Sequence, residues 1–214
     1  MSNEFGYVGT AKPTQAVKSN SGVFSVNEHK ELIEDKKLLS FGQLELIETV
    51  VADDSVAFYD FDNLGDYSVH FFTANNIQGA STTAQNLDIR VKVGGSVDSG
   101  ANYHFAQQLG NGAGTFSESK ATGFNQFIWL SNVDNETNAT ANGYAYIYNA
   151  IDSTKYTFGT FQMVVKQDIH TPRMAFGSNV HVSSSACSGL RVFLATTGNI
   201  AEGSISLYGI KAYS

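Results

Sequence analysis

After residue 42 the sequence consists of short runs in which apolar and polar residues alternate, separated by loops rich in Gly, Ser, Asn and Thr. The run IRVKV is the clearest: it directs Ile89, Val91 and Val93 to one side, and Arg90 and Lys92 to the other. A period of two is the spacing of a β-strand with one buried face. We therefore expect the three apolar residues to face a core and the two cations to face water.

About eleven such runs predict strands after residue 42, and no segment after residue 48 has a helical period over more than a few turns. Many short strands joined by turn-rich loops are typical of an antiparallel β-sandwich or jelly roll. We expect an all-β domain over residues 43–214. The runs are Leu44–Glu48, SVAFYDF, DYSVHFF, Ile89–Val93, NYHFAQQL, FNQFIWL, YAYIYNA, KYTFGTFQMVV, RMAFGSNVHV, LRVFLAT and Ile205–Leu207.

The charge balance limits the possible partners. The chain has 20 acidic and 13 basic residues, a net charge of −7, and one cysteine, Cys187. Nucleic acids bind to basic surfaces, so we expect no such partner. No window approaches the roughly 20 apolar residues of a membrane span. The first residues show no signal-peptide pattern, so we expect a soluble protein made in a cytoplasm, without disulfides.

Residues 1–42 differ in composition from the rest and predict an extended arm followed by one short helix. Residues 1–48 carry 12 charges, whereas the remaining 166 residues carry 21. Ser25 and Glu28 form a capping box at the start of VNEHKELIEDKKLL, a helix too short to be stable alone. Isolated apolar residues without a period cannot form a core, so we expect them to dock on another surface. These are Phe5, Tyr7, Val8, Val17, Val23 and Phe24 of the arm, with Leu32 and Ile33 of the helix.

The sequence offers little for catalysis or metal binding. No Gly-x-Ser-x-Gly motif is present, and no two histidines have a spacing typical of metal ligands. Asp60, Asp62 and Asp66 resemble the alternating oxygen ligands of a calcium loop, but the downstream glutamate is missing and such residues also form turns. We expect no metal, no cofactor and no enzymatic activity.

A row of tyrosines is the remaining candidate site. Tyr144, Tyr146 and Tyr148 fall on one face of a predicted strand, and Trp129 lies on a neighbouring run. Tyrosine rings supply flat apolar area together with a hydroxyl group, which suits stacking against sugar rings. The same row suits the edge of a core or a contact between subunits. The sequence leaves these three alternatives open.

Both ends of the chain resemble virion structural proteins of tailed bacteriophages, especially marine ones. At the start the resemblance lies in GYVGTAKPTQ, SNSGVFSVNEHKELIEDKK and LELIETV. Between the ends it is one of pattern, in VHFFTANNI, DSGANYHFA and YIYNAIDSTKY. At the end it lies in GNIAEGSISLYGIKAYS, with Gly203, Ile205, Leu207, Tyr208, Gly209 and Ile210 in a pattern common to phage sandwich domains.

The resemblance implies a non-enzymatic part of a virion. Its N-terminal arm would dock on other virion proteins, and its β-sandwich would face outward. We expect a component attached to the tail, such as a fibre or spike, and a homo-oligomer, with a trimer as the preferred state. The alternatives are a head decoration protein and a module that binds a glycan of the host surface.

Overall fold

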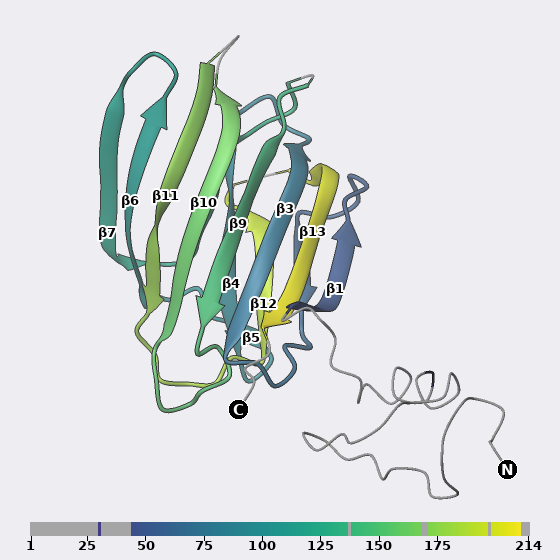
Figure 1. Ribbon diagram of the computed structural model, residues 1–214, viewed down its shortest axis with the longest axis vertical. Coiled ribbons are helices and arrows are strands. Elements are labelled where there is room, and N and C mark those ends of the chain that lie inside the picture. Colours follow the sequence, from purple (N-terminus) through teal and green to yellow (C-terminus); the bar gives the residue numbers. More distant parts are fainter. Residues whose placement is uncertain (1–29, 31–43, 137, 168–170, 197, 211–214) are drawn as a thin grey trace, which may run out of the picture. The chain divides into compact units, whose positions relative to one another are not determined.

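Two antiparallel β-sheets pack face to face in the computed structural model (Figure 1). They belong to the second of the two units into which the chain divides, Met1–Gln43 and Leu44–Ser214. In the first unit Lys30 is described and is helical. The predicted docking residues of the arm and helix all lie outside the described part. The structure describes residues 30, 44–136, 138–167, 171–196 and 198–210.

The large sheet has eight strands, and every neighbouring pair is antiparallel. Strands from both ends of the unit lie side by side in it, so the sheet forms only when the whole unit folds. Its order is β1 (Leu44–Val51), β13 (Ile200–Ile210), β3 (Val69–Gly79), β9 (Ala141–Tyr148), β10 (Thr157–Gln167), β11 (Thr171–His181), β6 (Tyr103–Asn111) and β7 (Phe116–Phe124).

The small sheet covers one face of the large sheet, and Figure 1 shows β4, β12 and β5 behind it. Gly94 and Gly95, both with positive φ, form the two-residue turn between β4 and β5, as tight hairpins require. The strands are β2 (Phe58–Phe61), β12 (Gly189–Leu194), β4 (Gln85–Val93) and β5 (Ser96–Val97), with β8 (Phe127–Val133) paired to β4.

The core lies between the two sheets and is rich in aromatic rings. Phe72 of the large sheet has its ring centroid 5.2 Å from that of Phe61 and 5.8 Å from that of Trp129, both in the small sheet. Aromatic pairs at these separations add stability beyond the apolar area that they bury. The predicted all-β sandwich is therefore confirmed.

Within the described residues no helix is long and apolar enough to span a bilayer.

Two strands and one side-chain orientation differ from the prediction. β5 and β7 were not among the predicted runs, because neither has an apolar alternation. The strand at Ile89–Val93 is present, but Lys92 does not face water: only 6% of its surface is exposed. Its Nζ donates to Asp60 Oδ2 at 3.0 Å and to Asp62 Oδ1 at 2.5 Å. Burial is possible here because two carboxylates neutralise the ammonium group.

Candidate ligand-binding face

The three tyrosines lie on the outer face of the large sheet, away from the core. Their neighbours in β9, Ala145 and Ile147, point inward and are buried, whereas Tyr144 is 39% exposed. This arrangement excludes the alternative in which the row belongs to the core of this unit. A subunit contact and a ligand face both remain compatible with it.

Two further aromatic residues extend this row across the neighbouring strands. Phe71 of β3 lies opposite Tyr146, with ring centroids 4.7 Å apart, and Tyr208 of β13 lies opposite Phe71 at 6.1 Å. We call Phe71, Tyr144, Tyr146, Tyr148 and Tyr208 the aromatic ladder. Because the rings lean on one another, the ladder is a preformed apolar surface rather than a set of separate side chains.

A groove continues from the ladder toward the far edge of the sheet. The strand register aligns Thr160 of β10, Ser178 of β11 and Ala106 of β6 in a row across the outer face, and all three are exposed. These small side chains form the floor. The rows on either side carry larger side chains, so the floor lies lower than its flanks. The flanking residues are Phe158, Val180 and His104 on one side, and Gln162, Phe176 and Gln108 on the other.

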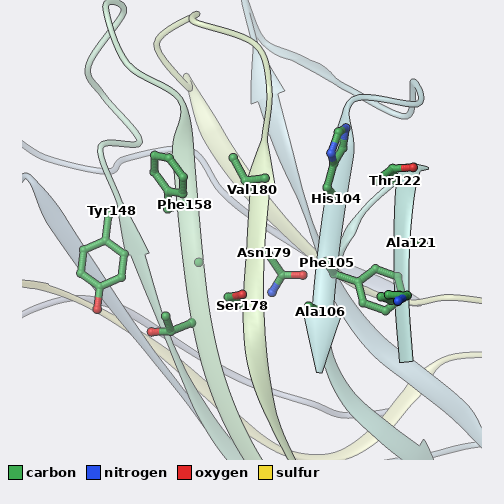
Figure 2. A pocket seen from close by; sticks show the side chains of 13 residues that line it. His104, Phe105, Ala106, Ala121, Thr122, Tyr148, Phe158, Ser178, Asn179 and Val180 are labelled. Atoms are coloured by element: carbon green, nitrogen blue, oxygen red, sulfur yellow. The ribbon is translucent and has the colours of Figure 1, made fainter. Parts of the chain in front are cut away.

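The groove has two adjoining parts that share Ser178, Ala106 and Lys120. The larger part encloses about 670 Å³ and the smaller about 280 Å³. Figure 2 shows the larger part, with Tyr148 and Phe158 at one end and His104 and Thr122 at the other. Both parts are open to solvent along their length. Such a trough fits an extended ligand better than a small molecule that must be enclosed.

Polar and apolar groups alternate along the groove. Phe158 is 45% exposed and Phe176 50%, so each presents ring area that a bound ligand would cover. Thr160 and Ser178 supply hydroxyl groups on the floor, between the two rings. Beside the groove, the Tyr144 hydroxyl donates to Gln162 Oε1 at 2.6 Å, which orients both side chains. Ring faces combined with fixed polar groups can stack on a sugar and bind its hydroxyls.

Trp129 does not belong to this face, and its assignment to a ligand or subunit face is wrong. It lies in β8 of the small sheet and is 2% exposed. Its ring packs against Phe72 in the core, as described above. The apolar run FNQFIWL predicts a strand but does not indicate which residues point inward, because five consecutive residues of it, 126–130, are buried.

The three candidate calcium ligands do not form a common site. Asp60 and Asp62 are in ion pairs, whereas Asp66 is in none with a described residue. Asp60 accepts hydrogen bonds from Arg191 Nε at 2.6 Å and Nη2 at 2.7 Å, in addition to that from Lys92. These bonds, that from Arg191 above all, lower the pKa of Asp60. Asp66 is exposed, and the described residues contain no ion pair to it. Nor does any group of three His, Cys, Asp or Glu side chains among them have a geometry suited to a metal ion.

Three polar groups are buried elsewhere in the fold, away from the groove. His181 is fully buried, and its Nε2 lies 2.8 Å from Asp98 Oδ2. Cys187 is buried with its Sγ 3.6 Å from Thr157 Oγ1, and burial raises the pKa of the thiol, which keeps it un-ionised. Asp88 accepts hydrogen bonds from Trp129 N and Gln126 Nε2 inside the protein. These groups brace the fold and do not line the groove.

No family model, curated protein or solved structure matches this chain. These comparisons therefore add nothing to the evidence for a binding role, which comes from the face itself. Of the predicted site residues, the structure brings together the three tyrosines and separates Trp129 from them. Sequence reasoning missed the groove, whose floor residues come from three strands. The only local signal was the alternation of Phe158, Thr160 and Gln162 in KYTFGTFQMVV, which has meaning only once the strand register is known.

Proposed function

We propose that this protein is a non-enzymatic attachment component of a tailed-phage virion, such as a fibre or spike protein, and that its β-sandwich binds a saccharide of the host surface. The virion assignment rests on the resemblance at the two ends of the chain. The binding role rests on one observation: the outer face of the large sheet carries an open groove that begins at exposed aromatic rings.

The composition of the groove supports binding rather than catalysis. Glycoside hydrolysis normally requires two carboxyl groups on either side of the scissile bond. The larger part of the groove contains no Asp or Glu, and the smaller part contains only Glu118. A ligand lying in the groove would therefore meet ring faces and hydroxyl groups but no acid–base pair.

A glycan array probed with the purified full-length chain tests the binding role. Phe158→Ala and Tyr148→Ala are each expected to weaken binding by about tenfold, since they remove a stacking ring. Ser178→Trp should abolish it by filling the floor. Phe116→Ala is the matched control, because Phe116 is an exposed ring on the same face but does not line either part of the groove. Absence of binding, or equal binding by all variants, would refute the proposal.

A second feature favours self-assembly through the opposite edge of the same sheet. The outer face of edge strand β1 exposes Leu44, Leu46 and Val51, with Leu46 59% and Val51 71% exposed. Exposed apolar residues on an edge strand are unusual in a monomer and typical of a contact surface. β1 and the groove lie at different ends of the strand order, so both can be used at once.

Light scattering after size exclusion tests this contact. We expect the wild-type chain to form a homo-oligomer, with a trimer as the preferred state, and Leu46→Glu to lower its mass toward that of the monomer. Glycan binding should be unaffected by Leu46→Glu. A monomeric wild-type chain would rule out the contact but not the saccharide site.

A further inference from the structure

The groove has an uneven charge distribution. Lys120 of β7 lies directly opposite Ala106 of the floor, is exposed, and makes no ion pair with any described residue. His104 lies near the same end (Figure 2). No acidic side chain lines the larger part, although the chain carries 20 acidic residues and a net charge of −7. A cation in a groove without acidic side chains gives that part of the groove a potential that favours an anionic ligand group.

One carboxylate, that of Glu118, lies close enough to Lys120 to affect the binding of an anion. Glu118 is two residues from Lys120 on the same face of β7, where it lines the smaller part of the groove, opposite Gln108. It weakens the attraction of the smaller part for an anion. An anionic group is therefore expected in the larger part, on the side of Lys120 that faces His104 and Thr122.

The distance between the rings and the cation limits the size of the ligand. Phe158 is in β10 and Lys120 in β7, and these strands are separated by β11 and β6. Three strand spacings of about 4.8 Å amount to roughly 14 Å. One sugar ring cannot cover this span, so a ligand that contacts both ends must contain several rings.

We propose that the groove binds an acidic oligosaccharide, with a sugar ring stacked on Phe158 and Tyr148 and a carboxylate paired with Lys120. This inference rests on the proposed saccharide-binding function and specifies its ligand class. Charge complementarity selects the acid, and the ring faces select a sugar over a simple anion.

The experiment is an array of oligosaccharides containing uronic or sialic acids, each placed beside its methyl ester, probed with the full-length protein. The ester retains the shape and the hydroxyls but lacks the charge. We expect at least one acid to bind about tenfold more tightly than its ester. Lys120→Met should remove this difference, Glu118→Gln should increase it, and Phe158→Ala should weaken both members of the pair equally. Both charge variants are at exposed positions, so folding is not at risk.

The outcomes separate the two proposals. Equal binding of acids and esters, both sensitive to Phe158→Ala, would overturn the acidic ligand and leave the saccharide site standing. Absence of any saccharide binding would overturn both. Competition by polyglutamate as strong as that by the acidic sugar would show that charge alone is recognised, and would overturn the assignment to a saccharide.

Discussion

The ring of Tyr67 occupies the space that a Cβ atom on residue 209 would need, so this position in β13 accepts only glycine without rearrangement. The Tyr67 hydroxyl donates a hydrogen bond to Glu45 of β1, which raises the pKa of Tyr67 to about 12. Tyr67, two residues before β3, thus reaches across Gly209 to the edge strand β1. Gly209 belongs to the terminal segment on which the resemblance to phage sandwich domains rests.

Gly209→Ala should displace Tyr67 and break its hydrogen bond to Glu45. We expect the free energy of unfolding to fall by about 1–3 kcal/mol, the usual cost of inserting a group into a packed site. Denaturant unfolding measures it. Gly79→Ala is the control, because its nearest neighbours would lie at an ordinary 3.7 Å. In a double-mutant cycle, Gly209→Ala should lower the free energy of unfolding less in the Tyr67→Ala background than in the wild type. Strictly additive effects would contradict the contact between Tyr67 and position 209.

Asp60→Asn should destabilise the fold by leaving Lys92 and Arg191 without their shared partner. Lys92 is nearly buried, so we expect a loss of about 2–4 kcal/mol in the free energy of unfolding. Hydrogen bonds from Arg191 lower the pKa of Asp60, so its contribution is present above the ordinary pKa of 3.8 and is lost as the pH falls below it. Chemical denaturation across a pH series measures both effects. Asp152→Asn should cost much less, because its ion pair with Lys155 lies at the surface and an amide oxygen can still accept the hydrogen bonds from Thr154.

For the buried Asp88 we expect the opposite pH dependence of the free energy of unfolding. Burial raises its pKa from 3.8 to about 7, so the folded state binds this proton more tightly than the unfolded state does. Its contribution is complete below pH 4 and is lost as the pH rises toward 7. The free energy of unfolding of the wild type, measured relative to Asp88→Asn, should therefore fall over this interval. Each pKa unit corresponds to about 1.4 kcal/mol. Parallel stability curves for the two proteins would show that Asp88 is not shifted.

The proposed virion role predicts that removal of residues 1–24 abolishes incorporation into virions without unfolding the β-sandwich. The buried apolar core reaches from Phe61 to Leu207, within the second unit. Circular dichroism and thermal melting of the truncated chain test folding, and particle assembly in its presence tests incorporation. Normal incorporation of the truncated chain would contradict a docking role for the arm.

Much of the sandwich could be predicted because strand alternation is local. In IRVKV the sequence predicts both the strand and the burial of Ile89 and Val91. It cannot predict the burial of Lys92, because the partner carboxylates are Asp60 of β2 and Asp62 directly after it, some 30 residues earlier in the chain. Alternation shows which side chains share a face, but not whether another element covers that face. β7 was missed for a related reason: as an edge strand it needs no apolar face, and FSESKATGF has none.

The candidate site could be predicted only in part. Alternation within YAYIY places Tyr144, Tyr146 and Tyr148 on one face correctly, yet the choice between core and surface depends on which sheet β9 joins. The groove floor is even harder to predict from the sequence. Ala106 and Ser178 are some 70 residues apart in the chain and become neighbours only through the pairing of β6 with β11. A row of small residues can be recognised in a sequence only when it runs along one strand. The row on the groove floor runs across three strands.

The transverse course of the groove has a consequence for how ligand choice can change. Each strand contributes one residue to the floor, and the residues before and after it in the chain point to the opposite side of the sheet. Variation at Thr160, Ser178 and Ala106 would therefore remodel the binding surface while leaving the interior of the sandwich untouched. In the proposed binding role, the choice of ligand could therefore change one position per strand without loss of the scaffold.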